Sequence, residues 1–247
     1  MRGQKVTAKH KLIVWGLFAL VLLATKLGLW LFFTGYLARH DVLAEDSAVP
    51  VVVIEADGFA ELAAATRESV VFIQSYVGVE CDELVASGVG FAIDDEGLIA
   101  TNHHVVAEGE RILVHFPCGL VIPASVWRED EALDVALLAT GVATRGLALG
   151  RRLQLEAGDA VVYVSRDDND TLAVTGKVIT PNGYRNGQWM IHLDIPVVPG
   201  QSGSPVLSAD GKVVGMVSYY IVDTGVRSRS MAVGIDDVIK VWVGDTK

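Results

Sequence analysis

The chain contains a histidine, an aspartate and a serine, in that order, each within a short segment of distinctive composition. They are His104 in ATNHHV (100–105), Asp134 in LDVAL (133–137) and Ser202 in GQSGSP (200–205). A serine hydroxyl is a weak nucleophile until a base within hydrogen-bond reach takes its proton, and a carboxylate can orient that base. The pattern predicts acyl transfer, with Ser202 as nucleophile, His104 as base and Asp134 as the group that orients the histidine.

The glycines around the serine suit a second need of this chemistry, which is a set of donors for the developing oxyanion. Glycine allows sharp turns, so the backbone N–H groups of Gly200 and Ser202 can converge on one point as an oxyanion hole. Taken alone, each motif also has a structural interpretation: a Gly/Ser-rich hairpin, a histidine that ends a strand, and a strand-edge acid. Their joint presence in this order favours catalysis.

Short strands are the elements that must bring these residues together. From Ser69 onward, runs rich in Val, Ile and Tyr alternate with turns rich in Gly, Asp and Asn. About a dozen such runs over residues 69–240 are typical of an all-β barrel or sandwich. They suit two small barrels, which we place at about residues 69–142 and 143–240.

Two short helices and two acidic turns complete the predicted domain. Helix-favouring residues predict a helix at 59–68, and a closing helix is expected at 236–242. The acidic segments 94–97 and 167–170 lie between predicted strands. Gly97 supplies the positive φ of a hairpin turn, and the second segment lacks the spaced ligands of a calcium loop. We therefore expect no metal site and no cofactor.

Charge is divided unevenly along the chain. Six of the 20 basic residues and none of the 30 acidic residues lie in the first 39 positions. The remainder has 14 basic and 30 acidic residues, a formal charge of −16. This part of the chain has no basic patch, so nucleic acid is not an expected partner. Hydrophobic residues make up 51% of the 247 residues, enough for a sizeable core.

Residues 12–33 form an apolar run with a single charge, Lys26. A helix of roughly 20 residues crosses a hydrocarbon core, and the basic residues before the run favour a cytoplasmic N-terminus. We predict a single transmembrane helix in the inner (cytoplasmic) membrane within residues 1–39, a linker at 40–57, and a domain at 58–247 in the periplasm or outside the cell. The alternative is a cleaved signal peptide, whose apolar region would be shorter, about 7–15 residues.

The chain has two cysteines, Cys81 and Cys118. Outside the cytoplasm they could pair in a disulfide, since both fall near the edges of the first predicted barrel. The alternative is two buried free thiols. Neither cysteine has the surroundings of a nucleophile or of a metal ligand.

Together the motifs resemble those of chymotrypsin-fold (trypsin-like) serine proteases and are most similar to the HtrA/Deg branch. In SGVGFAI (87–93) followed by GLIATNHHVV (97–106), the histidine counted fourth from the threonine is the catalytic one, which selects His104 over His103. LDVAL and GQSGSPV resemble the aspartate and serine motifs. VGMVSY (214–219) and MAVGI (231–235) resemble the strand that lines the substrate channel and its neighbour.

This resemblance implies a double six-stranded β-barrel with the active site between the barrels. His104 and Asp134 would come from the first barrel and Ser202 from the second. Ser218 matches a family position that contacts the aspartate and the substrate backbone. Many HtrA proteins continue into PDZ domains, but the chain ends at Lys247, so we expect none here. Regulation would then fall to the protease loops, the anchor, a homo-oligomer or a regulatory subunit.

Two departures from the family pattern concern the serine loop. Gln201 stands where digestive relatives carry the aspartate that captures a newly cut N-terminus, so that route of activation is not expected here. Ser204 stands in place of the usual second glycine and adds a β-carbon near the oxyanion loop. Some branches of the family carry serine there, so we expect it to be tolerated.

Other departures concern the substrate. Pro196 stands where digestive relatives carry an acid that binds a basic P1 side chain, and Ser218 stands where glutamate-selective relatives carry histidine. We therefore expect a small or medium apolar P1 residue. The predicted substrate-binding residues are Pro196, Val197, Val198, Ser218 and Tyr219.

The predicted function is that of a membrane-anchored serine endopeptidase that hydrolyses peptide bonds of unfolded or signalling proteins outside the cytoplasm. The alternative is a catalytically weak or silent peptide-binding module on a protease fold, which would hold an extended peptide by strand addition. The complete triad argues against this alternative, since a binding module does not need all three residues.

Overall fold

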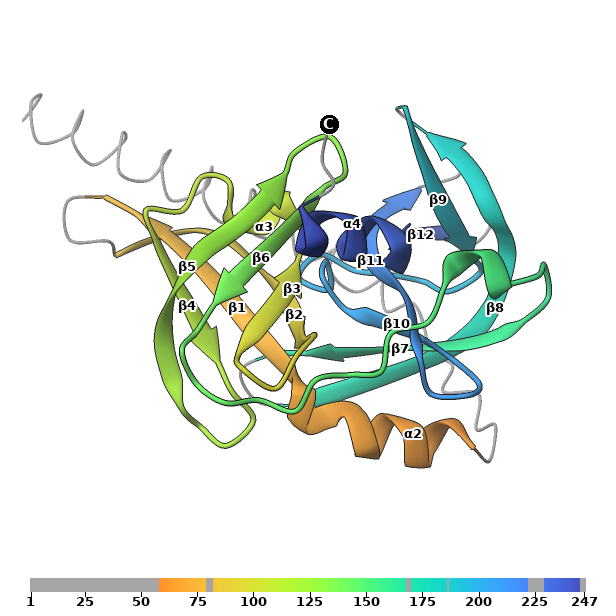
Figure 1. Ribbon diagram of the computed structural model, residues 1–247, viewed down its shortest axis with the longest axis horizontal. Coiled ribbons are helices and arrows are strands. Elements are labelled where there is room, and N and C mark those ends of the chain that lie inside the picture. Colours follow the sequence, from red (N-terminus) through yellow and green to blue (C-terminus); the bar gives the residue numbers. More distant parts are fainter. Residues whose placement is uncertain (1–57, 79–81, 168–169, 186, 222–228, 245–247) are drawn as a thin grey trace, which may run out of the picture. The chain divides into compact units, whose positions relative to one another are not determined.

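The computed structural model describes residues 58–78, 82–167, 170–185, 187–221 and 229–244 (Figure 1). The predicted membrane span, its basic tip and the linker lie outside these residues, as does Cys81. Among the described residues, no helix is both long enough and apolar enough to cross a membrane.

The first barrel is closed by six antiparallel strands in the order β1-β2-β3-β6-β5-β4. Its strands are β1 (Val70–Val77), β2 (Glu83–Ala92), β3 (Leu98–Thr101), β4 (Arg111–His115), β5 (Val121–Asp130) and β6 (Val135–Ala139). A one-turn helix, α3 (His103–Val106), follows β3. The strands of the first barrel therefore run from Val70 to Ala139.

The second barrel is also closed, with its strands in the order β10-β11-β12-β9-β8-β7. These strands are β7 (Ala160–Arg166), β8 (Thr171–Arg185), β9 (Gln188–Leu193), β10 (Pro205–Ser208), β11 (Val213–Ile221) and β12 (Arg229–Gly234). A 3₁₀ turn, η2 (Arg152–Gln154), lies in the connection between the barrels. Figure 1 shows the first barrel in orange to green and the second in green to blue. The all-β, double six-stranded prediction is confirmed.

Strand β6 shows how the sequence packs the two barrels together. Val135 and Leu137 point into an apolar cluster that also contains Met216 of β11 and Val233 of β12. Ala136 and Leu138 point into the separate core of the first barrel. Successive side chains of a strand alternate between its faces, so a strand buried on both faces reads as a continuous apolar run.

The predicted helices are present with slightly different ends. Helix α2 (Phe59–Thr66) is followed by a 3₁₀ turn, η1 (Arg67–Ser69), and it buries Phe59, Ala63 and Thr66 on one face. Helix α4 (Ile235–Val243) follows β12 and ends at Gly244 with φ +80°. Such a left-handed C-terminal glycine commonly ends a helix.

Helix α4 also connects the two barrels. It follows the last strand of the second barrel, and Arg128 of β5 in the first barrel donates through Nη1 to the carbonyl of Trp242 at 2.6 Å. The guanidinium of Arg128 also lies 4.3 Å from the centre of the Trp127 ring. A cation over an aromatic face adds a further attraction.

The acidic segment 94–97 forms the predicted hairpin turn. The Asp94 carboxylate accepts hydrogen bonds from the N–H groups of Glu96 and Leu98, and Gly97 has φ +99°. Within the described residues, no group of three or more His, Cys, Asp or Glu side chains could hold a metal ion.

Cys118 is exposed and forms no disulfide with another described residue. The interpretation of two buried thiols is therefore wrong for Cys118, because it lies in the solvent-exposed turn between β4 and β5. Its pairing with Cys81 stays a prediction.

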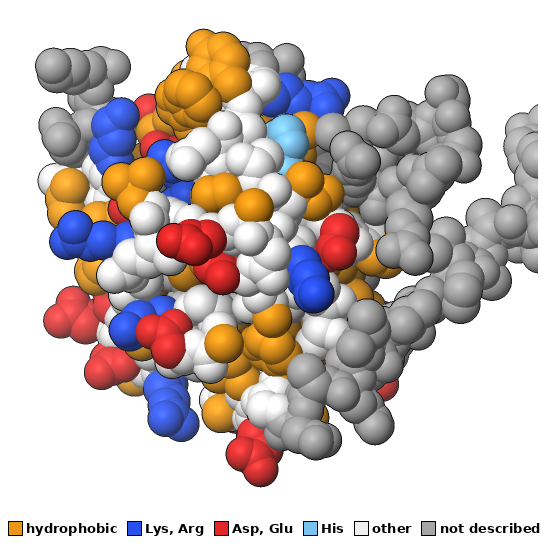
Figure 2. Space-filling view, turned by 90° about the vertical axis from the view of Figure 1, so that its right-hand side faces the viewer, with side chains coloured by type: hydrophobic (Ala, Val, Ile, Leu, Met, Phe, Trp, Pro, Cys, Tyr) orange, Lys and Arg blue, Asp and Glu red, His pale blue; other side chains and the backbone are white. Residues whose placement is uncertain are grey.

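The surface carries charges of both signs. Figure 2 shows acidic and basic side chains interspersed over one face, with hydrophobic side chains in small groups. One exposed aromatic pair is formed by Tyr184 of β8 and Trp189 of β9, whose ring centroids are 4.9 Å apart.

Candidate active site

His104 and Asp134 contact each other in the first barrel. His104 lies on α3, and its Nδ1 is 2.9 Å from Oδ1 and 3.0 Å from Oδ2 of Asp134. The backbone N–H of His104 also donates to Oδ1 at 3.1 Å. The histidine side chain is 42% exposed and the aspartate side chain 6%. A buried carboxylate thus contacts and orients a partly exposed imidazole.

Asp134 has an unusual backbone conformation. Its φ of +52° makes it the sole non-glycine with positive φ in the described part of the chain. This left-handed region costs an L-residue roughly 1–2 kcal/mol, although Asp and Asn adopt it more readily than most. The buried Asn102 supports the conformation by donating through Nδ2 to the Asp134 carbonyl at 3.0 Å. Asn102 belongs to the histidine motif, but the motif alone does not predict this role.

Ser218 of β11 links the aspartate to the second barrel. Its hydroxyl donates to Oδ2 of Asp134 at 2.5 Å, and its own backbone carbonyl accepts from the Ser202 hydroxyl at 3.3 Å. Ser218 therefore contacts both the predicted nucleophile and the predicted orienting acid. A chain of contacts thus runs from His104 through Asp134 and Ser218 to Ser202.

Two consecutive turns shape the loop that carries Ser202. In the first, the N–H of Gln201 donates to the Val198 carbonyl at 3.2 Å, and Gly200 has φ +92°. Proline second and glycine with positive φ third are the residues of a type II turn, and the sequence here is Val198-Pro199-Gly200-Gln201. None of the hydrogen bonds within the described part of the chain uses the N–H of Gly200 or Ser202.

The second turn begins at Gln201. The N–H of Ser204 donates to the Gln201 carbonyl at 3.2 Å, and Gly203 has φ +91°. The Ser204 hydroxyl, which is fully buried, donates to the same carbonyl at 2.7 Å. The Ser204 side chain therefore stabilises the turn. This explains how serine can replace the second glycine of the family motif here.

The serine loop lies directly against the first barrel. The Ser202 carbonyl accepts a hydrogen bond from the N–H of Val89 in β2 at 2.7 Å. A Cβ on Gly203 would lie 1.8 Å from the Val89 carbonyl oxygen, and one on Gly88 would lie 2.9 Å from the Ser202 oxygen. Glycine at both positions allows the two backbones to approach this closely.

The profile of the family described as the trypsin-like peptidase domain matches residues 88–216, more than half of the chain. The chain belongs to this family. The matched segment contains His104, Asp134 and Ser202.

Individual relatives of this trypsin-like peptidase come from animals and bacteria. "Serine protease HTRA1A" of Danio rerio is 34% identical over 142 residues, covering 53% of this chain and 30% of that protein. A "Probable periplasmic serine endoprotease DegP-like" of Pseudomonas fluorescens is 33% identical over 165 residues, covering 64% of this chain and 35% of that protein. The chain spans about a third of the length of these curated relatives. The comparisons support the expected likeness to HtrA and a serine endopeptidase.

The predicted substrate-binding residues lie in different environments. Val197 is 8% exposed and packs in the core of the second barrel, whereas Val198 is 54% exposed beside the serine loop. Pro196 is partly buried, and its carbonyl oxygen lies 3.1 Å from the Tyr163 hydroxyl. Tyr219 lies on β11, but its side chain is outside what the structure describes. Their contacts with substrate stay predictions.

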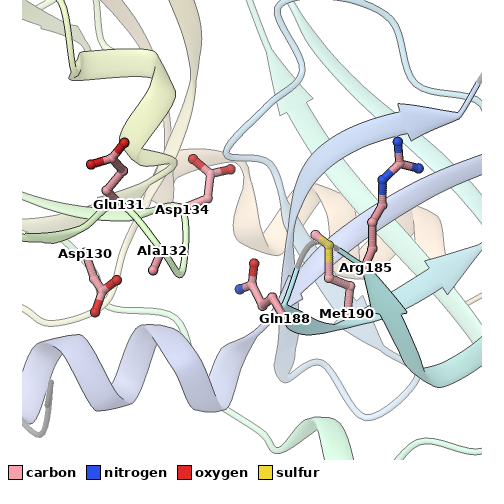
Figure 3. A pocket seen from close by; sticks show the side chains of 7 residues that line it. All are labelled: Asp130, Glu131, Ala132, Asp134, Arg185, Gln188 and Met190. Atoms are coloured by element: carbon pink, nitrogen blue, oxygen red, sulfur yellow. The ribbon is translucent and has the colours of Figure 1, made fainter.

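A cavity of about 610 Å³ lies beside Asp134 (Figure 3). One wall comes from the end of β5 and the following turn, and the other from the β8–β9 hairpin, whose Gln188 donates through Nε2 to the Leu133 carbonyl at 2.9 Å. The lining residues are Asp130, Glu131, Ala132, Asp134, Arg185, Gln188 and Met190. Apart from Asp134, none of them could be predicted from the sequence, because the two walls are far apart in the chain.

Proposed function

We propose that the chain is a serine endopeptidase in which Ser202, His104 and Asp134 act as a catalytic triad. The observation that carries the proposal is the position of Asp134, which contacts the imidazole of His104 and the hydroxyl of Ser218. Ser218 in turn contacts the hydroxyl of Ser202 through its carbonyl. Family membership supports the same reaction class.

In the proposed reaction the Ser202 hydroxyl attacks the carbonyl carbon of the scissile peptide bond. Its hydrogen bond to the Ser218 carbonyl is long, at 3.3 Å, and therefore weak enough to be given up. With Nδ1–H directed at Asp134, Nε2 of His104 takes the proton of the hydroxyl and then delivers it to the leaving amine. Water releases the acyl group in a second step with the same base.

The N–H groups of Gly200 and Ser202 are the proposed oxyanion donors. No hydrogen bond among the described residues uses either group, which supports this role. Preorganised donors of this kind account for about 10²–10³ in kcat each.

The proposed substrates are polypeptides with a small or medium apolar P1 residue. Val198 is exposed and borders the serine loop. Pro196 stands at the position where digestive relatives carry the acid that binds basic side chains. The cavity beside Asp134 is next to the reacting groups and offers space for substrate residues near the scissile bond. A cleavage profile with Lys, Arg or Glu at P1 would contradict this preference.

The proposed location is the outer side of the cytoplasmic membrane, with residues 12–33 as the anchor. The length of that apolar run and the basic residues before it support the proposal. The Pseudomonas fluorescens relative is named as a probable periplasmic protein, which is consistent with this location. Fractionation of cells, with protease protection of the 58–247 domain, tests this location.

Digestion of an unfolded protein by the full chain and by Ser202→Ala tests the proposed activity. We expect the native chain to cleave the substrate and the variant to lose cleavage while still binding it. A native chain that binds unfolded protein without cleaving it would favour the peptide-binding alternative.

A further inference from the structure

Gln201, the residue before the proposed nucleophile, is held by the interior of the second barrel. The residue is 9% exposed. Its Oε1 accepts one hydrogen bond from the Val198 N–H at 2.9 Å and another from the Tyr163 hydroxyl at 2.9 Å. Since the Gln201 N–H also donates to the Val198 carbonyl, Gln201 closes the Val198–Gln201 turn twice.

Tyr163 provides a fixed anchor for this contact. It lies in the middle of β7, is 1% exposed, and packs in the core cluster that also contains Val197 and Val217. Its hydroxyl is also 3.1 Å from the Pro196 carbonyl, so the same phenol faces both ends of the segment that precedes the nucleophile. Burial raises the pKa of the phenol, which keeps it a neutral proton donor.

The direction of the Gly200 N–H depends on this turn. A type II turn differs from a type I turn chiefly by rotation of its central peptide, here the peptide between Pro199 and Gly200. That rotation would turn the proposed oxyanion donor away from the reacting carbonyl. Contacts at residues 198 and 201 hold the two ends of the turn in place, and Gly200 with φ +92° sets the direction of the central peptide between them.

We propose that Tyr163 and Gln201 are positioning residues that hold the oxyanion loop in its binding conformation through an uncharged phenol–amide contact. This inference rests on the proposed function, because it assigns these residues a role in that activity. No charged group takes part in the contact, so the loop needs neither an ion pair nor a newly formed N-terminus to stay assembled.

Two variants test the inference in the full chain. Gln201→Leu removes the acceptor at nearly constant volume, and Tyr163→Phe removes one donor. With a peptide amide substrate, we expect kcat to fall about 10- to 100-fold in Gln201→Leu and by a smaller factor in Tyr163→Phe. KM should change less than about threefold, because an oxyanion donor acts mainly in the transition state. Gln201→Glu, which keeps an oxygen acceptor for both donors, should restore kcat to within about fivefold of the native value.

A matched control is available in the first barrel. Tyr76 of β1 donates its hydroxyl to Oε1 of Gln74 at 2.9 Å, which is a second phenol–amide pair. Tyr76→Phe should leave kcat within about twofold of the native value, since deletion of a partly exposed neutral hydrogen bond costs only about 1 kcal/mol of stability and moves no oxyanion donor.

Hydrogen–deuterium exchange gives a readout that does not depend on activity. We expect faster exchange in the segment 196–203 of Gln201→Leu and Tyr163→Phe, and native exchange in Tyr76→Phe. Native exchange and native kcat in a folded Gln201→Leu or Tyr163→Phe variant would overturn the inference. A native chain that cleaves no peptide would instead contradict the proposed function, and the exchange result would still decide whether the contact holds the loop.

Discussion

The backbone N–H of Val89 donates to the carbonyl of Ser202 at 2.7 Å. Val89 belongs to β2 of the first barrel and Ser202 to a loop of the second, so this bond ties the proposed nucleophile to the barrel that carries His104 and Asp134. The alignment of the proposed triad therefore depends on close backbone contact between the barrels.

Gly203→Ala should disrupt this contact. Its new Cβ would meet the Val89 carbonyl at 1.8 Å, in addition to the strain of φ +91°. We expect loss of peptidase activity and a loss of stability above about 2 kcal/mol in chemical denaturation. Gly119→Ala is the matched control, since Gly119 has φ +85° but open space around it. Equal effects of the two substitutions would show that the contact between the barrels contributes nothing to stability or activity beyond the strain of a positive φ.

Asp134→Asn tests the proposed orienting role of the carboxylate. The amide can no longer accept from both the imidazole and the Ser218 hydroxyl, so the imidazole loses its favoured tautomer. We expect kcat to fall by about 10⁴ with little change in KM. Circular dichroism should show an intact fold. A fall of less than tenfold would contradict the role assigned to Asp134.

Ser218→Ala separates two contacts of one residue. It removes the hydroxyl that donates to Asp134 and leaves the carbonyl that accepts from Ser202. A hydrogen bond to a charged group contributes about 1.5–3 kcal/mol, so we expect kcat to fall roughly 10-fold or more. Ser208→Ala, which removes an exposed hydroxyl on β10, is the control. Native kcat in Ser218→Ala would show that Asp134 needs no support from the second barrel.

The carboxyl group of Asp237 on α4 should make the stability of the fold depend on pH. Burial raises its pKa above the ordinary value, although a hydrogen bond from Gln188 and the charges of Arg152 and Lys240 partly oppose the shift. The folded state therefore disfavours the ionised carboxylate, and this penalty is complete at neutral pH. Asp237→Asn should raise the unfolding temperature at pH 7. The difference should shrink as the pH falls through the raised pKa and vanish below the ordinary value of about 3.8. A difference that grows in acid would contradict the assigned direction.

Local patterns in the sequence were sufficient to predict most of the fold. The apolar run of β6, the turn at Gly97 and the amphipathic helix α4 each carry their own signal within a few residues. The histidine, aspartate and serine motifs could be recognised for the same reason, because glycine and polar residues interrupt apolar strands at these points.

Contacts between distant segments could not be predicted from local patterns. Tyr163 reads as an ordinary strand residue, and only the folded barrel brings its hydroxyl to Gln201. The cavity beside Asp134 likewise combines a turn of the first barrel with a hairpin of the second. The side chain of Val197 packs in the core of the second barrel, which its short local segment does not indicate. Such contacts depend on strand register and on how the two barrels pack together. No short segment of the sequence determines either of these.

The most direct test of the central claim is covalent labelling of the folded protein by a fluorophosphonate, with the modified residue located by mass spectrometry. The account predicts a single adduct on Ser202, strongly reduced in His104→Ala and absent after unfolding. Failure of the native protein to react, or an adduct on another serine with Ser202 unmodified, would contradict it.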